Sequence, residues 1–103
     1  MGISDPIDEF RNTRLHGYAI EGNVAGVKLL IANGADVNAR NIDNETPLHA
    51  VACGGNVEVA EILIANGADP NAKTNEGKTP LETAIVYEQE EMVEKLNRYL
   101  KNS

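Results

Sequence analysis

The sequence predicts an all-α repeat fold, an α-solenoid of stacked helix pairs with hairpin-like loops projecting from one side. Two observations carry this prediction. The chain repeats itself with an offset of 33 residues, and 16 of the 33 positions in Thr13–Glu45 are identical in Thr46–Lys78. Each unit also shows two helical patterns followed by a run of turn residues. At 103 residues, the chain is expected to form one domain, residues 1–103, with a modest core.

Residues 1–12 precede the first full repeat and are expected to form an N-terminal cap extension. They carry a helix start, with Ser4 or Asp5 as the capping residue and acidic residues in the first turn. We therefore expect one helix over residues 5–21 and no projecting loop before Thr13. Four apolar residues would share one face of this helix: Ile7, Phe10, Leu15 and Tyr18.

The central unit, residues 46–78, has the clearest helix signals. Thr46 is expected to cap the first helix, with Pro47 at the first helical position. Gly54 and Gly55 should end that helix, because glycine adopts left-handed backbone conformations readily. The buried faces are predicted to comprise Leu48, Val51 and Ala52 in the first helix and Val57, Ala60, Leu63 and Ile64 in the second.

The second helix of this unit is expected to begin after Asn56 and to end at Gly67. The following stretch, ADPNAKTNEGK, lacks helical periodicity and predicts a hairpin-like finger. Gly77 would take the turn position that requires positive φ, and Asn44 is its counterpart one period earlier. Arg11 stands at the same register position before the first unit, where no finger is expected.

The third unit, residues 79–103, begins with TPLETA and departs from the pattern afterwards. Lys95 and Asn97 stand where the central unit has Ile62 and Ile64. A terminal repeat has no further neighbour, so one of its faces must be polar. We therefore interpret this unit as a C-terminal cap.

These residues resemble the ankyrin repeat. The family signature TPLHxAA…G…V…LL…GADVNA stands in the central unit as TPLHAVACGGNVEVAEILIANGADPNA. The resemblance covers about Thr13 to Leu100 and implies stacked helix–turn–helix units with β-hairpin loops. It divides the chain into repeat 1 (residues 13–45), repeat 2 (residues 46–78) and a C-terminal capping repeat (residues 79–103).

The two histidines, His16 and His49, are predicted to be structural. Each follows a threonine by three residues, and the third unit has Glu82 there, which forms a capping-box sequence with Thr79. A buried imidazole can also join neighbouring units by hydrogen bonds. A ligand-binding or catalytic role for the histidines is the alternative, and it requires a cleft with convergent polar groups.

No catalytic residue, metal ligand or cofactor is predicted. Cys53 lies near a helix C-terminus, which disfavours a thiolate, and is expected to be a small buried or half-buried residue, with a surface contact as the alternative. Four glutamates near the start of the last helix are interpreted as a solvated face, with an acidic docking patch as the alternative. They are Glu88, Glu90, Glu91 and Glu94.

Composition limits the classes of partner. The net charge of −7 disfavours nucleic acid and anionic membranes. The sequence shows no transmembrane run and no signal peptide, and its single cysteine fits a reducing, cytoplasmic location. We expect a monomer that binds another protein.

The resemblance implies a non-catalytic protein–protein interaction module whose concave face is built from finger tips and first helices. Tyr87, Arg40 and Ile42 are the expected anchors, because aromatic and arginine side chains dominate interface energies. The full set of predicted partner-binding residues is Arg40, Ile42, Asp43, Glu45, Lys73, Asn75, Glu76, Lys78 and Tyr87. A structural or engineered scaffold with no dedicated partner is the alternative. The resemblance also makes Asn38 and Asn71 candidates for asparaginyl hydroxylation.

Overall fold

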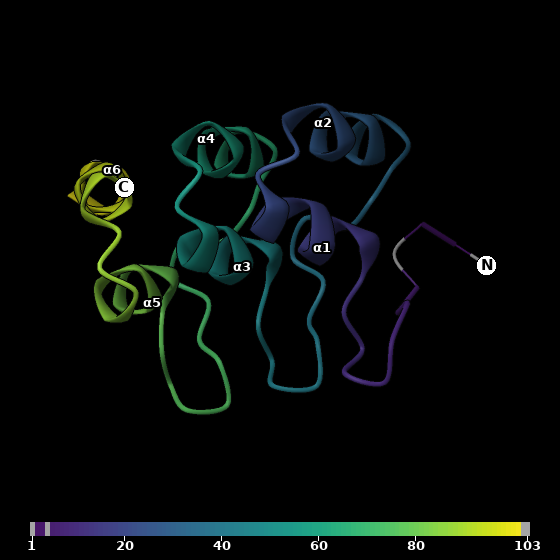
Figure 1. The fold of residues 1–103 in the computed structure, drawn as a ribbon, viewed down its shortest axis with the longest axis horizontal. Coiled ribbons are helices and arrows are strands. Elements are labelled where there is room, and N and C mark those ends of the chain that lie inside the picture. Colours follow the sequence, from purple (N-terminus) through teal and green to yellow (C-terminus); the bar gives the residue numbers. More distant parts are fainter. Residues whose placement is uncertain (1, 4, 102–103) are drawn as a thin grey trace.

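The computed structural model describes residues 2–3 and 5–101, and within them it contains six α-helices and no β-strand. The helices pair along the chain and form two layers (Figure 1), with α1, α3 and α5 beside the projecting loops and α2, α4 and α6 behind them. The predicted all-helical repeat fold is confirmed. The helices are α1 (Arg14–Glu21), α2 (Val24–Ala32), α3 (Pro47–Gly54), α4 (Val57–Ala65), α5 (Pro80–Val86) and α6 (Glu90–Lys101).

The helix starts follow from the capping residues that the sequence predicts. Thr46 accepts a hydrogen bond from the backbone N–H of His49, and Pro47 occupies the first helical position of α3. Asn56 caps α4 in the same way, through the N–H of Val59. Gly55 ends α3 with a left-handed φ of 77°.

The predicted helix over residues 5–21 is wrong, because α1 begins only at Arg14. The chain cannot be helical through Arg11, whose φ is +63°. A turn forms there instead: the Asp8 carboxylate accepts hydrogen bonds from the backbone N–H groups of Phe10 and Asn12, both at 3.0 Å. Ser4, the other proposed cap, lies outside the described residues.

Residues 5–12 are therefore a finger like those of the later units. We call residues 5–12, 38–45 and 71–78 the first, second and third fingers; in Figure 1 all three project to the same side. The expected positive φ is found at Asn44 (64°) and Gly77 (77°), and Arg11 matches them. Each finger reverses direction as a hairpin does, but none of the described residues forms a β-strand.

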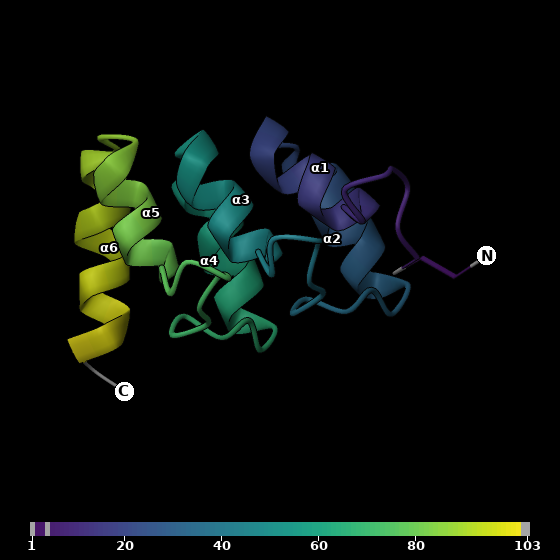
Figure 2. The ribbon, with the colours of Figure 1, turned by 90° about the horizontal axis from the view of Figure 1, so that it is seen from below.

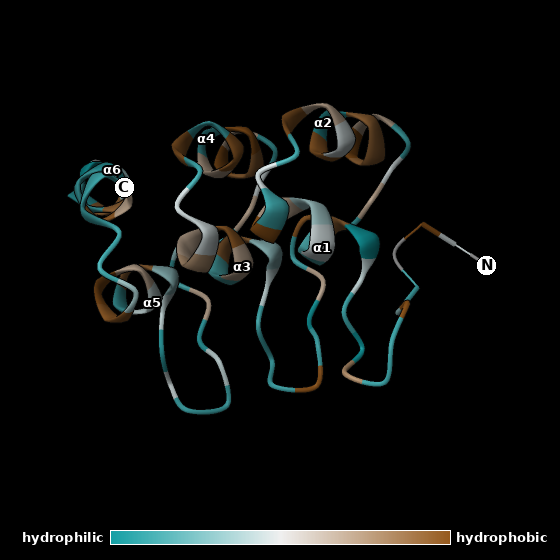
Figure 3. Ribbon diagram, viewed as in Figure 1, coloured by the Kyte–Doolittle hydropathy of each residue, from teal (hydrophilic) through white to brown (hydrophobic). Residues whose placement is uncertain are grey.

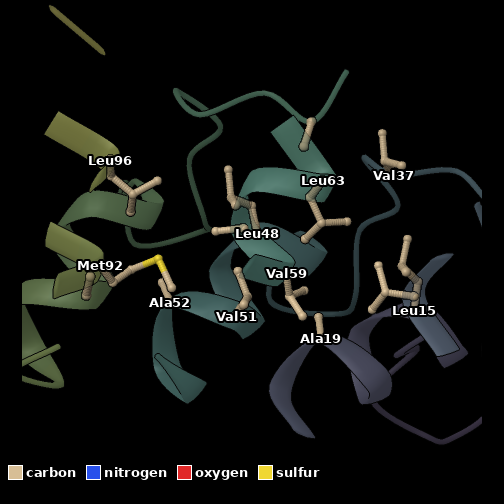
Figure 4. Packing of buried hydrophobic residues seen from close by; sticks show 14 of the residues in the cluster. Leu15, Ala19, Val37, Leu48, Val51, Ala52, Val59, Leu63, Met92 and Leu96 are labelled. Atoms are coloured by element: carbon tan, nitrogen blue, oxygen red, sulfur yellow. The ribbon is translucent and has the colours of Figure 1, made fainter. Parts of the chain in front are cut away.

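The core lies between the two helix layers and runs through all three units. Figure 4 shows Leu48 and Val51 of α3 next to Val59 and Leu63 of α4, with Leu15 on one side and Met92 on the other. The predicted faces are confirmed for Leu48, Val51, Ala52, Ala60 and Leu63, which are fully buried. Val57 and Ile64 are only half-buried, and Val59 lies deeper than either.

Helices α1 and α3 approach each other closely at Gly54. A Cβ atom added at Gly54 would lie 2.5 Å from the carbonyl oxygen of Ile20, so only glycine fits between these two backbones. In Figure 2 the three helix pairs stand side by side in chain order. Gly54 is thus a packing residue as well as the last residue of its helix.

The two ends of the stack differ. At the N-terminal end Tyr18 covers Gly26, where an added Cβ would meet the ring at 2.6 Å. At the C-terminal end α6 is mostly hydrophilic, as Figure 3 shows, and its Lys95 lies 3.8 Å from Glu61 of α4. Ile85 of α5 is nevertheless 55% exposed, although its counterpart Ala52 is fully buried. The predicted polar cap is therefore realised in α6 but not in α5.

Candidate functional site

The two histidines close the starts of their helices, as predicted. Nδ1 of His49 accepts a hydrogen bond from the backbone N–H of Thr46 at 3.0 Å, while the Thr46 hydroxyl accepts one from the N–H of His49. Nδ1 of His16 accepts from the N–H of Thr13 at 3.1 Å in the first unit. Glu82 forms the equivalent capping box with Thr79 in the third unit.

The same imidazoles also join each unit to the finger of the next. Nε2 of His16 lies 2.8 Å from the carbonyl oxygen of Glu45, and Nε2 of His49 lies 2.9 Å from that of Lys78. A carbonyl can only accept, so each Nε2 carries a proton, and each ring is neutral because its Nδ1 accepts a backbone N–H. Burial is the main reason that the pKa of both imidazoles is lowered. With both ring nitrogens engaged, neither histidine is available as a catalytic base.

Cys53 is half-buried, as expected from the sequence. Burial raises the pKa of its thiol, and a hydrogen bond with the Tyr87 side chain offsets only part of that effect. The thiol is therefore protonated at neutral pH and is a poor nucleophile. Among the described residues, no three histidine, cysteine, aspartate or glutamate side chains are grouped closely enough to hold a metal ion.

The three fingers are joined into one array by a repeated backbone hydrogen bond. The N–H of Ile42 donates to the carbonyl oxygen of Phe10 at 2.8 Å, and the N–H of Asn75 donates to that of Asp43 at 3.0 Å. These two bonds are related by the 33-residue repeat. Arg40 reinforces the array, since its guanidinium donates to the carbonyl oxygens of Asn44 and Lys73. The fingers therefore form a supported edge and are not independent loops.

A groove runs between this finger array and the first helices. It consists of two hollows of about 290 and 320 Å³, one on each side of the second finger. Asp43, Glu45 and Cys53 line both hollows, so the two adjoin at these residues. The groove crosses all three units and opens to solvent along its length.

The family model described as ankyrin repeats (3 copies) matches residues 15–102. The chain belongs to the ankyrin repeat family. A search of curated proteins found no significant match. Ankyrin repeats generally serve as protein-interaction modules and are generally non-enzymatic. In the described part of the chain, no helix has the length and apolar character that crossing a membrane requires.

The ankyrin groove brings together most of the residues that were predicted to bind a partner. Those lining the hollow between the second and third fingers are Asp43, Glu45, Asn75, Glu76, Lys78 and Tyr87. Three others lie outside its lining: Arg40, Ile42 and Lys73 are on the fingers. Ile42 remains 53% exposed, but the guanidinium of Arg40 is committed to carbonyl oxygens of the finger array. Whether any of the nine binds a partner stays a prediction.

Sequence reasoning missed the part of the groove that belongs to the first finger. Ile7, Asp8 and Phe10, together with Ile20 of α1, line the hollow between the first and second fingers. A signal was present, because the 33-residue offset aligns Asp8 with Asn41 and Thr74. All three side chains accept hydrogen bonds from the N–H groups two and four residues later. The helix-start pattern over the same residues obscured this alignment.

The acidic cluster near the start of α6 lies apart from the groove. Glu88, Glu90, Glu91 and Glu94 lie at the surface, and Glu90 and Glu91 occupy the first turn of the helix, where negative charge is favourable. Glu94 pairs with Arg98 one turn later. The cluster is therefore a solvated helix face, in agreement with the first interpretation.

Proposed function

We propose that this ankyrin domain is a non-catalytic interaction module that binds a protein partner through the groove between its fingers and its first helices. The observation that supports this most is that the repeated polar side chains maintain the fold, whereas several large apolar side chains beside the groove do not. The two histidines, with Thr13 and Thr46, are buried in capping and linking hydrogen bonds, while large apolar side chains remain exposed beside the groove. Phe10, Ile42 and Tyr87 are each more than half exposed and contribute little to the core.

The rigidity of the finger array also favours recognition. Interfaces whose loops are already ordered lose less conformational entropy on binding than flexible ones do. The hydrogen bonds from Ile42 to Phe10 and from Asn75 to Asp43 provide that order. We further propose that the module acts as a monomer in the cytoplasm, where a single unpaired cysteine is compatible with the reducing conditions.

The test begins with affinity purification from the source cell and mass spectrometry to identify a partner. Calorimetric titration then compares the wild type with the triple variant Arg40→Ala/Ile42→Ala/Tyr87→Ala. Loss of two or three anchors should weaken binding at least about tenfold. Because Arg40 also supports the fingers, the double variant Ile42→Ala/Tyr87→Ala separates recognition from loop order.

Leu29→Ala is the matched control, since Leu29 is 62% exposed on α2, in the layer behind the groove helices. It should leave the affinity unchanged. Equal affinities for the wild type, the control and both groove variants would refute the proposed surface. A purification that returns nothing above background would favour the alternative, a scaffold without a dedicated partner.

A further inference from the structure

The groove has a chemical character that goes beyond its shape, and any inference from that character rests on the proposed function. Its charged lining residues are mostly acidic: Asp8, Asp43, Glu45 and Glu76, against the single base Lys78. Hydrogen bonds, above all from Asn12, hold the pKa of the Asp8 carboxyl below its ordinary value, so Asp8 is ionised at neutral pH.

These carboxylates are not neutralised within the described chain. The ion pairs found there are Lys95–Glu61 and Arg98–Glu94, and both lie on the helices behind the groove. The basic side chain of Arg40 does not line either hollow and is bonded to backbone carbonyl oxygens. The negative potential of the groove is therefore available to a ligand.

One carboxylate is held in place at the centre. Oε1 of Glu45 accepts a hydrogen bond from Nδ2 of Asn41 at 2.8 Å, and Asn41 is itself bonded to Asn12 of the first finger at 2.9 Å. Glu45 and Asp43 line both hollows and so mark the middle of the groove. An ordered carboxylate needs less reorganisation to receive a cation than a mobile one does.

Apolar side chains lie in both halves of the groove. Phe10 and Ile20 line the hollow between the first two fingers, while Val86 and Tyr87 line the hollow between the second and third. Each of the four is more than half exposed. Asp43 and Glu45 thus lie between two hollows that each contain exposed apolar side chains among polar ones.

We propose that the partner presents a segment with a central arginine or lysine flanked on both sides by aliphatic or aromatic side chains. The cation lies against Asp43 and Glu45, and the flanking side chains enter the two hollows. Neither the cation nor the apolar side chains would suffice for binding alone. An exposed ion pair contributes little, and an uncharged apolar segment would strip water from the carboxylates without replacing it.

The test uses a displayed library of random dodecapeptides selected on the wild-type domain, followed by calorimetry on a synthetic peptide from the enriched set. The selected peptides should share a basic residue between apolar ones. The variant Asp43→Asn/Glu45→Gln should bind such a peptide about tenfold more weakly, with less dependence on salt. The glutamine introduced in this variant retains an oxygen for Asn41, so the finger stays closed.

Glu58→Gln/Glu61→Gln is the control, because it removes the same charge from α4, outside the groove, and should leave the affinity unchanged. Enrichment of neutral or acidic peptides, failure to enrich any peptide, or equal loss in both charge variants would overturn the inference. Phe10→Ala/Tyr87→Ala distinguishes it from the proposed function. If Phe10→Ala/Tyr87→Ala weakens binding and Asp43→Asn/Glu45→Gln does not, the groove is the binding surface but the preference for a basic segment is refuted. If none of these variants changes the affinity, both proposals fall.

Discussion

The substitution His49→Ala tests the role of the buried imidazole as a link between units. His49 is 1% exposed, and it serves the backbone N–H of Thr46 and the carbonyl oxygen of Lys78. Truncation leaves the Thr46 N–H without its acceptor, whereas the Lys78 carbonyl oxygen loses one of two hydrogen bonds and keeps the one from the Thr74 N–H. An unsatisfied buried donor costs about 1–3 kcal/mol and a lost hydrogen bond about 0.5–1.5 kcal/mol, so we expect a loss of about 1.5–4.5 kcal/mol in the free energy of unfolding. For a domain of this size that is a large share of the total stability.

Glu82→Ala supplies the comparison, because Glu82 closes the same capping box but is exposed, and it forms its hydrogen bonds with Thr79 at its own helix start. Its loss should cost only about 0.5–1 kcal/mol. Urea denaturation followed by circular dichroism measures both variants under identical conditions. A loss for His49→Ala no larger than that for Glu82→Ala would refute the reasoning, since the link to the next finger would then contribute nothing.

Three further predictions concern stability. Burial lowers the pKa of His16 and His49 below 6.5, so these histidines take up protons at higher pH in the unfolded chain than in the folded one. The histidine contribution to stability is therefore fully present above about pH 6.5 and is lost as the pH falls further. Urea titrations at several pH values should show the free energy of unfolding decreasing below about pH 6.5. Leu63→Ala, at a fully buried site, should cost about 2–5 kcal/mol, and a denaturation midpoint close to that of the wild type would contradict the core assignment. Gly54→Ala should force α1 and α3 apart and lower the free energy of unfolding by about 1–3 kcal/mol. Gly17→Ala should raise it by about 0.5–1 kcal/mol, because an added Cβ meets no atom within 4 Å and alanine favours the helix. Thermal unfolding in which Gly54→Ala is the more stable of the two variants would contradict the packing.

Predictions based on the repeat succeeded because they depend on local chemistry. Thr46 and Asn56 cap their helices, Gly77 and Asn44 take positive φ, and His49 closes its capping box. Each of these outcomes is decided by a few neighbouring residues, and two aligned copies of the sequence make the pattern visible. The order of the helices and the repeat architecture follow from the same signals.

The prediction for the N-terminal segment was wrong because that segment is held by a contact with a distant part of the chain. Asp5 and the acidic residues after it are compatible with a helix start, and the turn signal at Asp8 is visible only through its alignment with Asn41 and Thr74. The backbone hydrogen bond from Ile42 to Phe10 holds the segment against the second finger, and that contact joins residues far apart in the sequence. Ile7 and Phe10, expected on the face of a helix, consequently lie in the groove.

The sequence by itself determined the period, the caps, the turns and the structural character of the histidines, since these arise from interactions within one unit or between copies of the same unit. Only the tertiary structure decided that a finger forms in place of the expected helix, that the guanidinium of Arg40 supports the fingers, and that Asp43 and Glu45 lie between two hollows that contain exposed apolar side chains. The physical reason is that a groove forms where side chains from different units meet, and the position of such a meeting is set by how the units stack.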